Sequence, residues 1–139
     1  MKKILLLSTL MMFFYSCLIN LTPYMKKNYP SGIGYSDMLL SDSLYRIYYK
    51  GGSSDDLERI EDFALLRASE VTLLNGCNYF SILGEEKFTR ASAYTSENTS
   101  DIVSEPEVMF KIRCYKNKPD GIFYDAQYLL DKIEKKYGL

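Results

Sequence analysis

The sequence predicts a small two-layer α+β domain in which about three to five largely antiparallel strands are packed by two helices. Two observations predict this class. Apolar residues recur at helical spacing in two segments that each begin at an acidic capping residue and end at a glycine. Shorter segments between and after them are rich in strand-forming residues or alternate between apolar and polar. Residues 33–139 suffice for one modest core, so a single domain is expected there.

The first helix is the most regular segment of the chain. Asp55 and Asp56 precede it and can accept hydrogen bonds from the free amides of the first turn, with Glu58 at capping-box spacing from Asp55. Gly76 can adopt the left-handed conformation that commonly ends a helix. One face carries the apolar residues Leu57, Ile60, Phe63, Ala64, Ala68, Val71 and Leu74.

The remaining elements follow from shorter patterns. Four strands are predicted at residues 44–49 (with 33–36 as an extension at the front), 78–83, 88–94 and 108–115. Asp125 caps a second helix, in which Ala126, Leu129 and Ile133 recur at helical spacing. Residues 95–107 are polar and acidic, so an exposed loop is expected there.

The N-terminus predicts a signal peptide over residues 1–16. Lys2 and Lys3 give a positive start, and a twelve-residue apolar run follows from Ile4 to Tyr15. A membrane-spanning helix needs about 20 apolar residues, which makes an uncleaved anchor the weaker alternative.

Cys17 is the expected site of lipid attachment. Ser16 supplies the small residue that precedes the cysteine of a bacterial lipobox, whereas Phe14 and Tyr15 depart from that motif. Acyl chains on Cys17 would anchor the exported chain stably to a membrane of the cell envelope. Ordinary cleavage nearby, without lipid, is the alternative. Residues 17–32 then read as the lipidated cysteine and a tether, with Pro23, Pro30 and Gly32 among polar residues.

The mature chain is slightly acidic, which argues against nucleic acid as a partner. Without Lys2 and Lys3, the 17 Lys and Arg fall to 15 against 18 Asp and Glu, a net charge of −3. Binding to nucleic acid requires a basic face.

Arg67 interrupts the apolar face of the first helix. Glu70 lies three residues further on, within ion-pair reach along a helix. One interpretation is a guanidinium available to an anionic ligand or partner. The other, which we favour, is a locally paired arginine whose stem contributes to packing.

Residues 67–73 (RASEVTL) followed by 76–80 (GCNYF) resemble the RAAELTL…GYDYF motif of a family of small bacterial cell-envelope lipoproteins. Residues 34–37, 45–47 and 124–126 and Gly51 fall in the same order as shorter motifs of that family. Ser69, Cys77 and Asn78 depart from the motif. The resemblance implies an envelope location and a fold. It implies no reaction, because the family has no established activity.

The composition excludes several kinds of catalytic and metal site. The chain has no histidine, so it cannot form a Ser-His-Asp or Cys-His catalytic site and lacks the commonest transition-metal ligand. No phosphate-binding loop, calcium loop or zinc motif occurs, so no cofactor or metal is expected. The carboxylate pairs Asp55–Asp56 and Glu85–Glu86 could perform acid–base work, but helix caps and turns account for them more simply.

Two functions remain in view. The first is a non-catalytic, membrane-anchored lipoprotein that binds or scaffolds an envelope protein or polysaccharide. The second is a small hydrolase or sugar-modifying enzyme that uses carboxylates in a cleft. Tyr24, Tyr29, Tyr35, Tyr48 and Tyr49 could form a surface for the first function, but packing in the core and on the sheet is the interpretation that we favour.

Cys77 and Cys114 are the two thiols left once Cys17 carries lipid. Exported proteins meet oxidising surroundings, and a disulfide forms if their strands pair antiparallel with Tyr79 opposite Ile112. Two buried free thiols are the alternative.

Overall fold

The computed structural model of the chain describes residues 21–96 and 99–139. Its elements, in order, are β1 (Gly34–Ser41), β2 (Leu44–Lys50), α2 (Leu57–Leu74), β3 (Tyr79–Ser96), β4 (Thr99–Tyr115), β5 (Tyr124–Asp125) and α3 (Ala126–Tyr137). The signal peptide predicted over residues 1–16 and the predicted lipidation site Cys17 lie outside the described residues.

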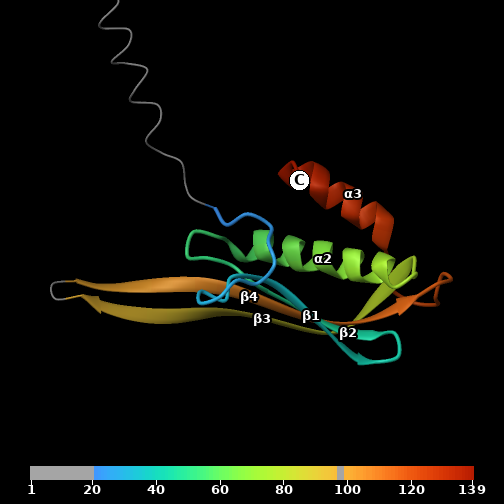
Figure 1. Cartoon of the computed structure of the whole chain (residues 1–139), viewed down its shortest axis with the longest axis horizontal. Helices are drawn as coiled ribbons and strands as arrows, with labels where there is room; N and C mark the ends of the chain where they lie inside the picture. Colours follow the sequence, from blue (N-terminus) through green and yellow to red (C-terminus); the bar gives the residue numbers. More distant parts are fainter. Residues whose placement is uncertain (1–20, 97–98) are drawn as a thin grey trace, which may run out of the picture.

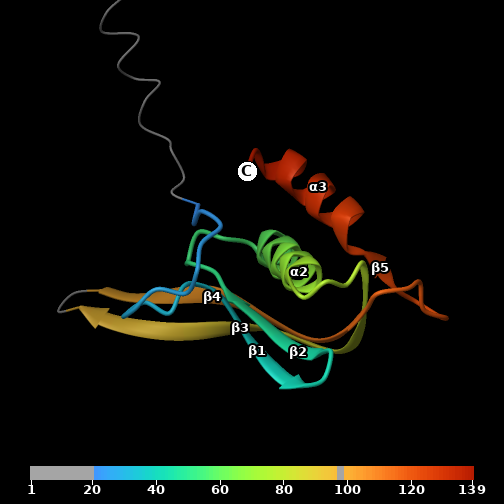
Figure 2. The same cartoon turned by 45° about the vertical axis from the view of Figure 1, so that its right-hand side comes forward.

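The described strands form one antiparallel five-stranded sheet in the order β1-β2-β4-β3-β5. Both helices lie on the same side of this sheet (Figure 1). The predicted α+β class is therefore confirmed. Helix α3 lies beyond α2 when viewed from the sheet, so α2 is covered by the sheet on one side and by α3 on the other (Figure 2).

Helix α2 begins and ends at the residue types that the sequence indicates. The carboxylate of Asp56 accepts a hydrogen bond from the Arg59 amide at 2.7 Å and forms the N-cap. Gly76 follows the last turn with φ of +72°, and its amide donates to the Leu73 carbonyl. The core lies between α2 and the alternating residues of β2 and β4, and its fully buried members include Ile47, Tyr49, Ile60, Phe63, Phe110 and Ile112.

The prediction of an exposed loop over residues 95–107 is wrong. β3 and β4 pair along their whole length, from Tyr79 opposite Tyr115 to Ser96 opposite Thr99. β2 pairs with β4 only as far as Glu107, so the outer half of the β3–β4 hairpin extends beyond the sheet as a two-stranded arm (Figure 1). Beyond Glu107 no further described strand pairs with the arm, and none of its residues belongs to the core cluster, so polar residues suit it.

The prediction of a tether over residues 17–32 is wrong for residues 21–32, which pack on the domain. We call these residues the strap. The strap and β1 form a bridge in which the Lys27 amide donates to the Tyr35 carbonyl and the Tyr35 amide donates to the Met25 carbonyl. Gly34 makes this approach possible, because its φ is +113° and an added Cβ would lie 2.6 Å from the Met25 carbonyl oxygen.

The strap also contributes to the core. The Tyr24 ring lies 5.0 Å from the Tyr35 ring and 5.4 Å from the Phe63 ring, between centroids. The Tyr49 hydroxyl donates to the Pro23 carbonyl and accepts from the Met25 amide, both at 3.3 Å. The packing interpretation of the tyrosine cluster thus holds for Tyr24, Tyr35 and Tyr49, whereas Tyr29 is 97 % exposed.

Candidate functional site

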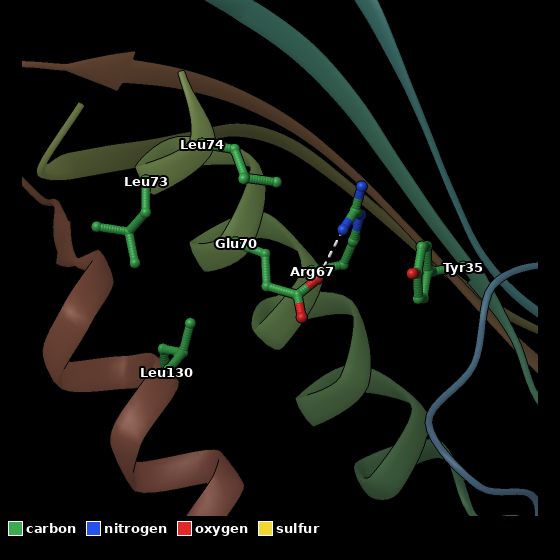
Figure 3. Close-up of a pocket in the computed structure, with 6 residues that line it drawn as sticks. All are labelled: Tyr35, Arg67, Glu70, Leu73, Leu74 and Leu130. Atoms are coloured by element: carbon green, nitrogen blue, oxygen red, sulfur yellow. Dashed lines mark hydrogen bonds and ion pairs between the residues drawn. The ribbon is translucent and has the colours of Figure 1, made fainter. Parts of the chain in front are cut away.

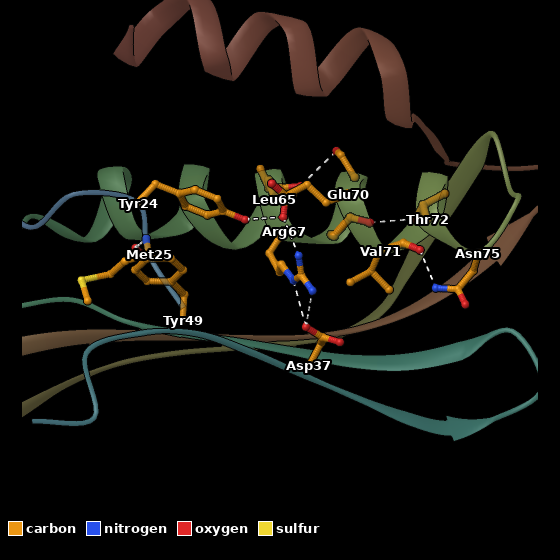
Figure 4. A network of polar contacts seen from close by, with 12 residues as sticks. Tyr24, Met25, Asp37, Tyr49, Leu65, Arg67, Glu70, Val71, Thr72 and Asn75 are labelled. Carbon is orange, nitrogen blue, oxygen red and sulfur yellow. Dashed lines mark hydrogen bonds and ion pairs between the residues drawn. The ribbon is translucent and has the colours of Figure 1, made fainter. Parts of the chain in front are cut away.

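Arg67 lies at the centre of a polar network that joins α2, β1 and the strap (Figure 4). Its Nε and Nη2 donate to Asp37 Oδ1, both at 2.8 Å, and its Nη1 donates to Glu70 Oε2 at 2.7 Å. The Tyr24 hydroxyl donates to the same Glu70 oxygen at 2.6 Å. The guanidinium also lies 4.3 Å from the centroid of the Tyr35 ring. The interpretation of Arg67 as a locally paired residue agrees with this geometry.

The electrostatics of the network follow from its burial and its pairing. Burial alone would lower the pKa of the Arg67 guanidinium, but the hydrogen bonds to Glu70 and Asp37 outweigh it and raise that pKa. Burial raises the pKa of the Tyr24 phenol, and its hydrogen bond to Glu70 raises it further. One cation therefore faces two carboxylates, and the cluster of Asp37, Arg67 and Glu70 has a net charge of −1.

A groove of about 440 Å³ opens beside this cluster, between α2, α3 and the start of β1 (Figure 3). We call it the α2–α3 groove. Leu73 and Leu74 from α2 and Leu130 from α3 form its apolar wall, and Arg67, Glu70 and Tyr35 complete it. Leu74 is 75 % exposed, so this apolar side chain lines the groove without filling it. A second hollow of about 270 Å³ lies on the other side of Arg67, against Asp37 and Lys26.

The groove combines two kinds of surface at short range. An apolar chain can lie against the three leucines, where its burial is favourable. A cationic or hydrogen-bond-donating end can meet Glu70, whose Oε1 has no partner among the described residues. An anionic end meets the excess negative charge of the cluster, and the donors of Arg67 already face Asp37 and Glu70. The geometry thus favours an amphiphile with a positive end.

Sequence reasoning found only part of this site. The Arg67–Glu70 pair was predictable from the spacing of three residues. Asp37 and Tyr24 were not, because they lie 30 residues from Arg67 and 46 residues from Glu70 along the chain. One sequence feature does point to Asp37. Tyr35 and Asp37 are two residues apart, so in a strand both side chains lie on the same face, which is the face toward the helix.

Cys77 and Cys114 lie side by side in the core. Their sulfur atoms are 2.8 Å apart, with both residues buried as free thiols. Burial raises the pKa of the Cys114 thiol to about 12, with a further contribution from its hydrogen bond to Cys77. The two strands are antiparallel neighbours, but in a register other than the one on which the disulfide was made conditional, because Tyr79 lies opposite Tyr115 rather than Ile112. The disulfide itself stays a prediction.

Three of the four carboxylates considered for catalysis have other partners among the described residues. The buried Asp55 carboxylate accepts from the Gly52 amide at 2.8 Å and the Thr22 amide at 3.1 Å, while Asp56 caps α2. Glu85 pairs with Lys87, and Glu86, its neighbour in β3, points to the opposite face of the sheet. Within the described ranges no three or more Cys, Asp or Glu side chains gather as a metal site.

No protein family model, no curated protein and no solved structure matches this chain. The resemblance to envelope lipoproteins therefore rests on the short motifs alone. Neither α2 nor α3 has the length and apolar character needed to cross a membrane.

Proposed function

We propose that this protein is a lipid-anchored lipoprotein of the bacterial cell envelope that binds an amphiphile with a positive end and does not act as a catalyst. The observation that carries the binding role is the α2–α3 groove, in which an apolar wall of three leucines adjoins a cluster of net charge −1. The N-terminal pattern supports the anchor. The carboxylate-dependent enzyme is the weaker proposal, because Asp55, Asp56 and Glu85 serve in caps and ion pairs and Glu86 points to the face of the sheet opposite to Glu85.

The anchor is tested at Cys17. In growing cells, Cys17→Ser is expected to abolish labelling of the protein with a fatty acid and to prevent its lipid-dependent retention in the membrane fraction. Cys77→Ser is the matched control, since it replaces another thiol and should leave labelling unchanged. Undiminished labelling of the Cys17→Ser protein would rule out the lipoprotein proposal.

The groove is tested with two probes of equal chain length and opposite charge, dodecylammonium and dodecanoate. Titration calorimetry on residues 21–139 should show tighter binding of dodecylammonium. Leu74→Asn should weaken that binding about tenfold, because a leucine wall loses part of its apolar contact. Ile122→Asn alters a residue that is 89 % exposed outside the groove and should change nothing. Tighter binding of dodecanoate, or no effect of Leu74→Asn, would contradict the proposed site.

A further inference from the structure

Over most of its length, the outer edge of β3 has no strand neighbour among residues 21–96 and 99–139. β3 pairs with β4 on one side throughout, but on the other side it pairs with β5 only at Tyr79 and Phe80. Residues 83–91 are all exposed, and no helix lies over this edge in either view of the fold (Figures 1 and 2). Such an edge offers a row of free backbone donors and acceptors to another strand.

The sequence of this edge is complementary to itself in one antiparallel register. A two-fold axis between two copies of β3 keeps the same face of both sheets on the same side. With the axis at Phe88, the two Phe88 rings lie opposite each other, and Glu86 of each copy lies opposite Arg90 of the other. These three residues share the face of the sheet that points away from α2, since they pair with Met109, Glu107 and Glu105 of β4.

Other registers bring like charges together or lose the Glu–Arg pairs. Moving the axis by one residue, to Lys87, places Lys87 opposite Lys87. Moving it by two, to Glu86, places Glu86 opposite Glu86; Glu85 then lies opposite Lys87, but these two residues already pair within one copy. In the other direction, an axis at Thr89 removes both Glu–Arg pairs, and an axis at Arg90 places two arginines together. If the two β3 strands paired parallel and in register, each charged residue would lie beside the same residue of the other copy. Like charges directly opposite each other destabilise a sheet, whereas opposite charges stabilise it.

The side chains concerned are available for these contacts. Phe88 is 39 % exposed, a large apolar side chain at the edge of a sheet. The side chain of Arg90 is 63 % exposed, although its Nε lies 3.4 Å from the buried carboxylate of Glu107. Glu86 forms no ion pair with any residue in the described part of the chain.

We propose that two copies of this chain associate through their β3 edges, antiparallel, with the two-fold axis at Phe88. The sheets then become one continuous sheet with all helices on the same side. The strap begins on that side too, because Thr22 binds Asp55 and Arg59 at the start of α2. Residue 21, the first described residue of each copy, therefore lies on the same side of the dimer in both, which suits the proposed anchoring of both copies in one membrane. The proposed groove is remote from this edge, so the two proposals stand or fall separately.

The test uses the full-length chain in intact cells. Two differently tagged copies are produced together, each with the photoreactive benzoylphenylalanine in place of Phe88. Illumination should give a product of twice the mass that carries both tags, because the two rings face each other at the axis. The same photoreactive residue at Ile122, which is 89 % exposed and lies outside β3, should give no such product.

Charge exchange then tests the register. Glu86→Arg should lower the crosslinked product about fivefold, because two attractive pairs become repulsive. Adding Arg90→Glu to the same chain should restore the product to within about twofold of the unaltered charges. The protease resistance of each variant shows that the domain has folded. No product at Phe88, a product with a different protein alone, or equal product in all charge variants would overturn the proposal.

Discussion

Replacing Phe63 with alanine should lower the free energy of unfolding by about 4 kcal/mol. Phe63 is fully buried, and its ring lies 5.4 Å from the Tyr24 ring, 5.4 Å from the Tyr49 ring and 5.0 Å from the Tyr137 ring, between centroids. These neighbours belong to the strap, β2 and α3. A single side chain on α2 thus holds three other parts of the domain, and its loss leaves a cavity at their junction.

Urea denaturation of residues 21–139 measures this effect. Phe63→Leu is the control, since it retains most of the apolar contact and should cost no more than about 1.5 kcal/mol. A local readout is available in the strap, where trypsin should cleave after Lys26 and Lys27 faster in Phe63→Ala than in the parent protein. A cost below about 1.5 kcal/mol for Phe63→Ala would contradict the role assigned to this ring.

Replacing Arg67 with methionine should cost about 2–3 kcal/mol, because two partly buried carboxylates lose their shared cation. The side chain of Arg67 is 16 % exposed, and those of Asp37 and Glu70 are 31 % and 26 % exposed. Methionine keeps an unbranched apolar stem, so the packing changes little and the charge accounts for most of the loss. The sequence alone, with Glu70 as the one visible partner, suggests a smaller cost.

The rescue variant separates charge from packing. Adding Asp37→Asn and Glu70→Gln to Arg67→Met removes the unpaired negative charge and should recover about half of the lost stability or more. The triple variant is measured by the same urea titration. If Arg67→Met costs less than about 1 kcal/mol, the network is a surface feature of little energetic weight.

The elements predicted correctly are those that local patterns determine. The start of α2 beside Asp55 and Asp56, its end before Gly76 and the alternation of Val108, Phe110 and Ile112 are all encoded within a few residues. The strand predicted at residues 88–94 lies in the β3 half of the arm, whereas the β4 half has the composition of a loop. The two strands of the arm are stabilised by pairing with each other rather than by an apolar face, so their residues can be polar.

The site was only partly predictable for the same reason. Glu70 is on the same helix as Arg67, whereas Asp37 reaches it only through the register of β1 on β2. The sequence of the strap predicts a tether because residues 21–32 carry neither a helical nor a strand pattern. What fixes it is the burial of Tyr24 among aromatic rings, and that depends on the assembled core.

If Cys17 carries a lipid as proposed, the fixed strap limits how far the domain can stand from the membrane. Thr22 is hydrogen-bonded to the start of α2, so a chain anchored at Cys17 has five residue steps (22 − 17) between lipid and domain. Fully extended, these steps span about 18 Å at most. If residues 17–32 were all an extended tether, the domain would reach about three times as far from the lipid. For the proposed anchored protein, binding would therefore be confined to molecules in, on or just above the bilayer, with the start of α2 as the end of the domain nearest to it.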